Sequence, residues 1–208
     1  LSLVVALLMV GCGESSTPST PVDPVDSPKA IDLDDNETRD KIIAEAIDAD
    51  KLEPMNVEFN LKKVLQEVID SLQQSAQGNK TAIILDYDED IPSHLMSDPL
   101  KLSQVFMNLV GNALKFTKNG EVRVVAKMLE KEEENVKLYF EVQDNGIGIS
   151  KDQQENIFEG FEQGSIQINR EYGGSGLGLT IVKSLLGLFD SKIQLESELG
   201  KGSKFYFE

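Results

Sequence analysis

Two glycine-rich clusters constrain the fold of this chain more than any other feature of its sequence. The first, DNGIGI at 144–149, directly follows the strand-like run NVKLYFEVQ. Glycines at the end of a strand let a flat ligand approach the backbone, although an ordinary Asn-Gly turn is the alternative. The second, GGSGLGL at 173–179, opens the helix-like run TIVKSLLGLF and so presents unpaired N–H groups and a positive dipole end to an anion. The second cluster follows neither the Walker pattern nor the GxGxxG dinucleotide pattern of a strand–helix unit, so both of those families are disfavoured.

A helix is predicted from Pro99 to about residue 117, because Asp98 is a capping carboxylate and proline suits the first helical position. Asn108, Asn112 and Lys115 recur on one stripe of this helix, within an arc of roughly 60°. Asparagine is unfavourable inside helices, so the stripe needs a reason. One interpretation is a solvent-facing stripe, and the other is a row of oxygen donors and one cation that faces a phosphate–magnesium group. The face expected in the core carries Leu102, Phe106, Leu109, Ala113 and Phe116.

The rest of the chain from about residue 54 alternates between strand and helix patterns. Strands are expected at 57–60, 81–88, 121–129, 135–144, 192–197 and 203–208, and helices at 61–77 and 178–189. The strands at 121–129 and 135–144 form a hairpin in the simplest interpretation, and IPSHLMSDP at 91–99 is expected to be a connecting loop. This pattern predicts one α/β domain over 54–208.

The net charge of −16 argues against binding the phosphate backbone of nucleic acids. One cysteine allows no internal disulfide bond, and one histidine allows no multi-histidine metal site. Residues 1–53 hold twelve acidic and four basic side chains, a net charge of −8, which is half of the total. The sequence therefore predicts an acidic tail on a more balanced domain.

The tail divides into three segments. Residues 1–12 are an apolar, signal-like stretch, too short for a membrane-spanning helix, which needs about 20 residues. Its end resembles the lipobox of bacterial lipoproteins, in which Cys12 would carry the lipid; a remnant of a longer apolar segment is the alternative. Residues 13–34 are expected to be a disordered Ser/Thr/Pro-rich and acidic linker, and 35–53 a short helix of uncertain origin.

Five motifs together resemble one family. NLVGNALKFT, DNGIGI, IFEGFEQ, YGGSGLGL and GKGSKFYF are similar, in order and spacing, to the N, G1, F and G2 boxes and the closing strand of sensor histidine kinase ATP-binding domains. This is the GHKL class, which also includes DNA gyrase, the mismatch-repair ATPases and a heat-shock chaperone family. The resemblance implies an α/β fold, a two-layer α/β sandwich of the Bergerat type, whose mixed sheet has helices on one face. It also implies ATP and Mg²⁺ as ligands.

The resemblance assigns roles to the predicted helix at 99–117 and to the first glycine cluster. Asn112 would ligate magnesium with support from Asn108, Lys115 would contact the phosphates, and Asn108 and Lys115 are the implied catalytic residues. Further implied contacts are Phe116 against the nucleotide, Asp144 at the adenine amino group, Gly146 and Gly148 shaping the base pocket, and Ser203 reaching the base through water.

A lid over about 162–175 is also implied. The phosphate-facing edge and hinge beside it would be formed by Gly174, Ser175, Gly176, Leu177 and Gly178. Arg170 and Gln163 would reach the terminal phosphate, and Phe158 and Phe161 would be packing residues that couple the lid to the core.

The implied reaction is transfer of the ATP γ-phosphate to a histidine in two-component signal transduction. In hydrolytic members of the class a glutamate activates water where this chain has Asn108, an amide without useful basicity, so hydrolysis should be slow. His94 is interpreted as a surface loop residue, so the phosphoacceptor would come from a His-bearing dimerisation domain, with a response regulator downstream. We therefore expect a histidine kinase that is incomplete by itself.

Such a domain is expected in the cytoplasm and associated with a membrane as part of a sensor kinase. A lipoprotein-like leader conflicts with that location, although the N-terminus could also tether the chain to a membrane. A nucleotide-gated protein-binding module, or an inactive kinase remnant fused to a lipoprotein-like leader, is the alternative function; an ATP hydrolase is a further rival.

Overall fold

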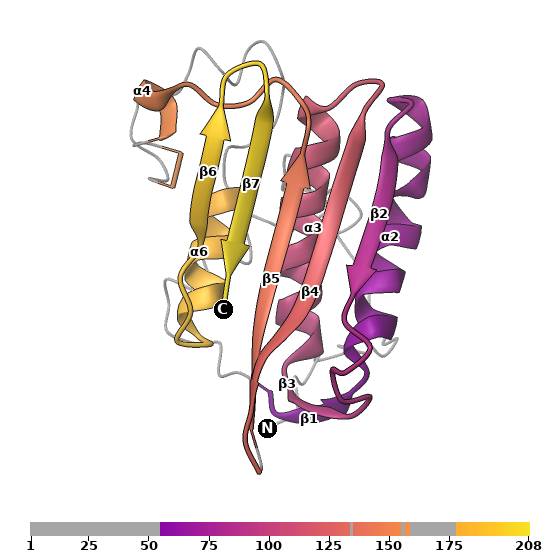
Figure 1. Cartoon of the computed structure of the whole chain (residues 1–208), viewed down its shortest axis with the longest axis vertical. Helices are drawn as coiled ribbons and strands as arrows, with labels where there is room; N and C mark the ends of the chain where they lie inside the picture. The colour runs from indigo at the N-terminus through magenta and orange to yellow at the C-terminus, as the bar shows by residue number, and fades with distance from the viewer. Residues whose placement is uncertain (1–54, 134, 155–156, 159–177) are drawn as a thin grey trace, which may run out of the picture. The chain divides into compact units, whose positions relative to one another are not determined.

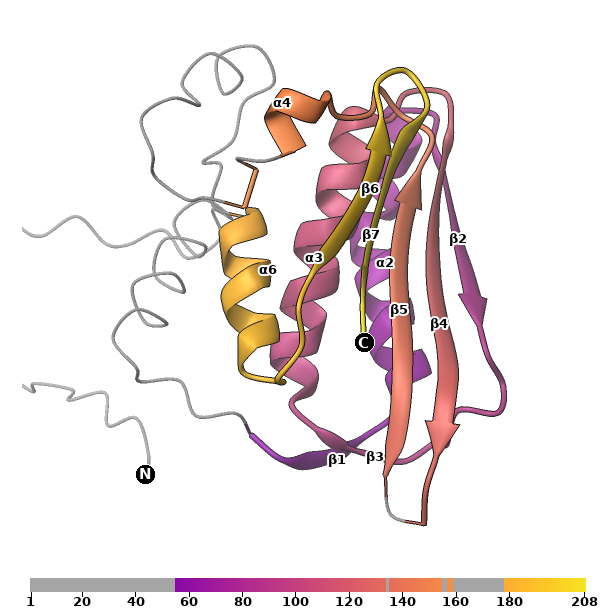
Figure 2. The ribbon, with the colours of Figure 1, turned by 60° about the vertical axis from the view of Figure 1, so that its left-hand side comes forward.

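Five strands form one mixed sheet, and three helices cover one of its faces (Figures 1 and 2). The computed structural model describes residues 55–133, 135–154, 157–158 and 178–208. The strands are β1 Val57–Phe59, β2 Ala82–Tyr87, β3 Leu95–Ser97, β4 Glu121–Lys131, β5 Val136–Asp144, β6 Gln194–Glu198 and β7 Gly202–Phe207. The helices are α2 Leu61–Gly78, α3 Pro99–Phe116, α4 Lys151–Gln154 and α6 Gly178–Gly187. The expected two-layer α/β architecture is confirmed.

The main sheet has the strand order β2-β4-β5-β7-β6. Within this sheet only β2 and β4 pair in parallel. The chain connects them through β3 and α3, which follow β2 and precede β4 in the sequence. The pairs β4–β5, β5–β7 and β6–β7 are antiparallel. Their register sets Asp144 opposite Val122 on one side and Ser203 on the other. Asp144 therefore ends the central strand of the sheet, and Figure 1 shows β5 between β4 and β7.

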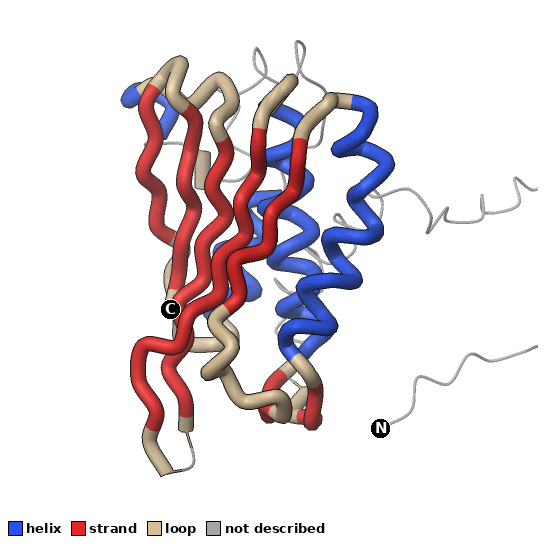
Figure 3. Tube along the Cα trace, turned by 45° about the vertical axis from the view of Figure 1, so that its right-hand side comes forward, coloured by secondary structure: helices blue, strands red, loops and turns tan. Residues whose placement is uncertain are grey.

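A second, two-stranded sheet joins β1 to β3 in antiparallel register, from Val57 opposite Ser97 to Phe59 opposite Leu95. Figure 3 shows this small sheet below the helices, separate from the main sheet. Our expectation of a plain loop over 91–99 was therefore wrong for three residues. They form a strand because β1 offers them a partner, a long-range contact that no local pattern reveals.

The core lies between the three covering helices and the main sheet. Phe106 of α3, Phe140 of β5 and Phe207 of β7 form a ring cluster with centroid separations of 5.1–5.9 Å. Rings at such separations add a favourable geometric term to the burial of their apolar area. Because Phe106 is fully buried, α3 is held against the centre of the sheet. None of the described helices is both long and apolar enough to cross a membrane.

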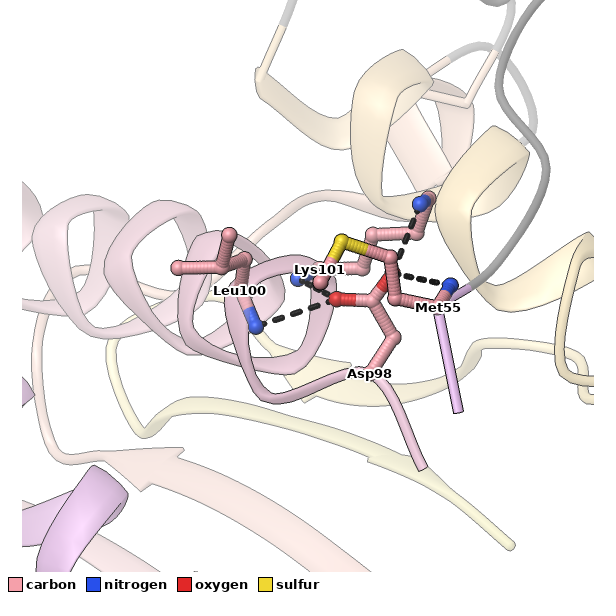
Figure 4. Close-up of polar contacts among 4 residues, drawn as sticks. All are labelled: Met55, Asp98, Leu100 and Lys101. Atoms are coloured by element: carbon pink, nitrogen blue, oxygen red, sulfur yellow. Dashed lines mark hydrogen bonds and ion pairs between the residues drawn. The ribbon is translucent and has the colours of Figure 1, made fainter. Parts of the chain in front are cut away.

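The N-terminus of α3 is fixed by Asp98, a carboxylate that is only 1% exposed (Figure 4). Its Oδ1 caps the helix by accepting hydrogen bonds from the N–H groups of Leu100 (3.1 Å) and Lys101 (3.0 Å). Its Oδ2 accepts from the N–H of Met55 (2.9 Å) and from the Lys101 ammonium (2.7 Å). Asp98 thus binds the start of the described chain to the helix that carries the candidate site residues.

Candidate nucleotide-binding site

The amide stripe of α3 faces the N-terminus of α6. A methyl group built on Gly178 would lie 3.6 Å from Asn112 Nδ2 and 3.7 Å from Asn108 Oδ1. Both asparagines are therefore partly covered by α6, which contradicts a purely solvent-facing stripe. Asn108 Nδ2 is buried and donates to no acceptor among the described residues. A buried amide without a partner is costly, so this position favours a polar ligand or an ordered water molecule.

Lys115 and Phe116 lie at the C-terminal end of the same stripe. Both side chains are half-buried, and Lys115 Nζ lies 5.2 Å from the centroid of the Phe116 ring. Burial lowers the pKa of Lys115 below its usual value. An anion beside the ammonium would oppose that effect by stabilising the charged form. The arrangement suits a cation that contacts phosphate oxygens while its ammonium group lies over an aromatic ring.

Asp144 ends β5 with a carboxyl group that is only 7% exposed. Burial raises its pKa, and the N–H groups of Gly146 and Ser203 and the hydroxyl of Thr117 oppose the increase. The Gly146 N–H donates to Asp144 Oδ1 at 2.8 Å. A carboxylate that is buried yet held by N–H donors can accept a hydrogen bond from an amino group of a bound base.

Glycine is required at two positions around Asp144. A methyl group on Gly146 would lie 2.3 Å from the carbonyl oxygen of Phe116, so the loop passes directly over the end of α3. Gly148 has a φ of +67°, and a methyl group there would lie 2.0 Å from the carbonyl oxygen of Glu198. The Gly200 N–H donates to the Ile147 carbonyl at 2.7 Å. The loop that follows β5 is thus packed between α3 and the β6–β7 turn, where no side chain fits.

Ser203 is buried beside Asp144 on β7. Its hydroxyl oxygen lies 3.0 Å from that of Ser197, and the Ser197 hydroxyl donates to the Gly202 carbonyl at 2.9 Å. Because the single Ser197 hydroxyl proton is donated to the Gly202 carbonyl, the Ser203 hydroxyl must be the donor to Ser197. Ser197 also accepts the Ile149 N–H at 2.8 Å. Ser203 therefore belongs to a hydrogen-bond network that links β7, the end of β6 and the loop after β5 beside Asp144.

The predicted site residues fall into two neighbouring groups. The first, around α3 and the start of α6, contains Asn108, Asn112, Lys115, Phe116 and Gly178. The second, around the end of β5, contains Asp144, Gly146, Gly148 and Ser203. Several predicted residues and the predicted lid at 162–175 lie outside the described residues: Phe161, Gln163, Arg170, Gly174, Ser175, Gly176 and Leu177. Phe158 is described and makes an edge contact with the Phe205 ring, with centroids 6.3 Å apart, in line with a packing role.

His94 lies just before β3 with a side chain that is 75% exposed, and its Nδ1 is 2.7 Å from Glu58 Oε1. Its prediction as a surface residue agrees with this exposure.

Two residues near Asp144 were not singled out from the sequence. Asn145 Oδ1 accepts the Glu121 N–H at 2.8 Å, so it joins the loop after β5 to the start of β4. Thr117 is fully buried, and its hydroxyl lies beside Asp144. Asn145 lies within the motif DNGIGI and Thr117 ends the motif NLVGNALKFT, but neither residue was given a role.

The sequence profile of the histidine kinase-, DNA gyrase B- and HSP90-like ATPases matches residues 97–208, more than half of the chain. The chain belongs to this family. It contains an ATP-binding catalytic domain of the sensor histidine kinase type.

Two curated relatives support the histidine kinase branch. The signal transduction histidine-protein kinase BarA of Escherichia coli is 34% identical over 171 residues, 80% of this chain and 19% of BarA. The sensor histidine kinase AruS of Pseudomonas aeruginosa is 41% identical over 155 residues, 74% of this chain and 16% of AruS. The chain thus spans less than a fifth of the length of either kinase.

Solved structures agree with these relatives. Full-length ShkA in complex with AMPPNP has a TM-score of 0.70 at 27% identity, over 82% of this chain and 34% of ShkA. A nucleotide-free catalytic domain of the histidine kinase ThkA has a TM-score of 0.60 at 25% identity, over 73% of this chain and 93% of that domain. The likeness covers nearly all of an isolated catalytic domain and only a part of a full-length kinase.

Proposed function

We propose that this domain binds ATP with Mg²⁺ and transfers the γ-phosphoryl group to a histidine on a dimerisation domain. The observation that carries the proposal is the meeting of the Asn108 and Asn112 amides with the α6 N-terminus at Gly178. A helix N-terminus favours anions, and amide oxygens are ligands that magnesium accepts, so the two features together suit a metal–triphosphate group.

The donor set fits magnesium better than a transition metal. The described residues contain no group of three or more His, Cys, Asp or Glu side chains that could hold a metal ion. Amide oxygens beside phosphate oxygens suit a hard ion that keeps several of its waters. In the proposed assignment Asn112 supplies the oxygen ligand and Asn108 supports it. Bound magnesium would neutralise phosphate charge, and Lys115 would add a second positive charge.

Asp144 would select the base. Its carboxylate lies at the middle of the sheet edge with Gly146 beside it, so an adenine amino group can donate to it at close range. Gly148 and Ser203 would hold the surrounding loop and strand in place. In the same proposal Phe116 would lie against the nucleotide. Arg170, Gly174, Ser175, Gly176 and Leu177 would contact its phosphates from the lid side.

Transfer is favoured over hydrolysis because Asn108 lies one helical turn before Asn112, the proposed magnesium ligand. An amide cannot take a proton from water, so positioning and charge neutralisation are what the site offers. The γ-phosphoryl group would bond to an imidazole nitrogen of the acceptor, and ADP would leave. His94 is a poor candidate for the acceptor because it lies in a connecting segment before β3 and not on a helix. We propose that the acceptor belongs to a separate cytoplasmic dimerisation domain, with a response regulator downstream.

Asn112→Ala tests this function. Binding of ATP is measured by calorimetry with and without Mg²⁺, and phosphate transfer from γ-labelled ATP to an added His-bearing two-helix domain is measured on gels. Asn112→Ala should abolish the magnesium dependence of binding and the labelling. The matched control is Gln74→Ala, an exposed helical amide on α2, which should leave both unchanged.

Two results would contradict the proposal. Unchanged magnesium-dependent binding in Asn112→Ala would remove the metal assignment. Tight ATP binding without labelling of any supplied histidine domain would support a nucleotide-gated binding module instead, and rapid phosphate release would support a hydrolase.

A further inference from the structure

The hydroxyl of Thr117 is buried directly beside the Asp144 carboxyl group. Thr117 is 0% exposed, and its Oγ1 makes no hydrogen bond of ordinary geometry with any described residue. A methyl group built on Gly146 would lie 2.8 Å from Thr117 Oγ1 and 2.9 Å from Asp144 Oδ1. The two oxygens thus face the same point at the base end of the site. The hydroxyl is also close enough to Asp144 to lower the pKa of that carboxyl group.

The backbone around Thr117 is fixed on both sides, so the hydroxyl has a defined place. Its carbonyl oxygen accepts the Thr81 hydroxyl at 3.1 Å, and the preceding carbonyl of Phe116 accepts the Ile147 N–H at 3.3 Å. Thr117 itself is extended, with φ −113° and ψ 128°, and ends α3. The orientation of the hydroxyl proton is therefore the main freedom left to this residue.

A buried hydroxyl without a partner costs free energy that a valine of similar shape would avoid. The presence of this hydroxyl beside a buried carboxyl group is explained if the two groups interact when a ligand is bound. A base that donates to Asp144 favours the charged carboxylate, and a carboxylate is a stronger acceptor for a neighbouring hydroxyl than a protonated carboxyl group.

We propose that Thr117 is a positioning residue for base recognition, whose hydroxyl donates to the Asp144 carboxylate and holds it toward the amino group of adenine. This rests on the proposed role of Asp144 in adenine binding. The Gly146 N–H holds one carboxylate oxygen, and the Thr117 hydroxyl adds a second restraint. Guanine presents a carbonyl oxygen where adenine presents the amino group, so an oriented carboxylate repels it. Thr117 would therefore contribute to selection of ATP over GTP.

The test compares Thr117→Val with Thr117→Ser in the 208-residue chain. Dissociation constants for ATP and GTP are measured by calorimetry with Mg²⁺, and unfolding in urea is followed for each variant. Thr117→Val should weaken ATP binding about tenfold, the usual effect of one lost hydrogen bond to a charged group. The preference for ATP over GTP, expressed as the ratio of their dissociation constants, should fall by the same factor. Thr117→Ser keeps the hydroxyl and should restore both values to within about twofold.

A double variant separates positioning from general destabilisation. If Thr117 acts through Asp144, Thr117→Val should change ATP affinity less than twofold in an Asp144→Asn background. The structural control is Ser191→Ala, which removes a buried hydroxyl that also has no hydrogen-bond partner among the described residues but lies after α6, away from Thr117. It should leave the ratio of ATP affinity to GTP affinity unchanged.

The possible results are distinct. Equal loss of ATP and GTP affinity in Thr117→Val, or the same tenfold loss in the Asp144→Asn background, would overturn the positioning role. Wild-type chain that binds neither nucleotide would instead overturn the proposed function on which it rests.

Discussion

Removal of the Asp98 carboxylate is expected to destabilise the domain more than removal of any exposed acidic side chain. Asp98→Ala deletes two hydrogen bonds that cap α3, one bond to the Met55 N–H and an ion pair with Lys101. Loss of the helix cap alone costs about 1 kcal/mol. The Lys101 side chain is only 11% exposed, so loss of its pairing with Asp98 adds a further penalty of about 1–3 kcal/mol. The expected total is about 2–4 kcal/mol.

The assay is urea unfolding at pH 7, followed by circular dichroism, with the slope of the transition checked for constancy. Asp98→Asn keeps an oxygen for the cap and loses the charge, so its cost should be smaller, about 1–2 kcal/mol. The control is Asp86→Ala, an exposed strand residue whose loss should change stability by less than about 0.5 kcal/mol. A loss of less than about 1 kcal/mol in Asp98→Ala would refute this account of the Asp98 contacts.

The pH dependence of the same series gives an independent check. Burial raises the pKa of Asp98, but the bonds from Lys101 and Met55 outweigh burial and hold the pKa below the ordinary 3.8. A carboxyl group whose pKa is lowered by folding stabilises the folded state above its unfolded pKa, and that contribution is lost as the pH falls through the folded pKa. The stability gap between wild type and Asp98→Asn should therefore be complete above about pH 4 and shrink below pH 3.8. A gap that stays constant down to acid unfolding would contradict this assignment.

Three further perturbations address the site. Burial raises the pKa of Asp144, so the folded state binds a proton there more tightly than the unfolded state and loses stability as the pH rises past about 4. Asp144→Asn should therefore raise the midpoint of urea unfolding at pH 7, yet weaken ATP binding at least tenfold. A lowered unfolding midpoint would contradict the argument from burial. Gly148→Ala should cost more than about 2 kcal/mol of unfolding free energy because of its positive φ and its overlap with Glu198, whereas Gly187→Ala, which meets no atom within 4 Å, should change stability by less than about 1 kcal/mol. Lys115→Gln should weaken ATP binding about tenfold and leave adenosine binding unchanged by calorimetry, and equal losses for both ligands would argue against a phosphate contact.

Much of the fold could be predicted because its elements carry long local patterns. Helices α2 and α3 and the hairpin β4–β5 show apolar residues at helical or alternating spacing over many positions, and all were expected close to their observed bounds. Strand β3 was missed because three residues are too few to show a period, and its pairing depends on β1. The strand order was not predictable from periodicity, since which strands pair is decided by tertiary packing.

The candidate site shows the same division. Asn112 and Asp144 were identified because their motifs are local and occur in a recognisable order. Thr117 ends the motif NLVGNALKFT but was given no role, because a threonine after a helix predicts only the end of that helix. Its burial follows from Thr81 and from the loop after β5, both distant in sequence. The tail segments and the lid contacts remain predictions, and so does the role of each residue toward bound nucleotide.

The hydrogen bond between Met55 and Asp98 holds the start of the described chain at one end of α3. Met55, the first described residue, is bonded at one end of this 18-residue helix, and Asn112 lies near the other end. At about 1.5 Å per residue, Asn112 lies roughly 21 Å along the axis from the capping position. A turn of the whole domain by about 10° about Met55 would therefore carry Asn112 through roughly 4 Å, more than the length of a hydrogen bond. In the reaction proposed above, a displacement of that size would change the distance between the bound phosphate and its acceptor.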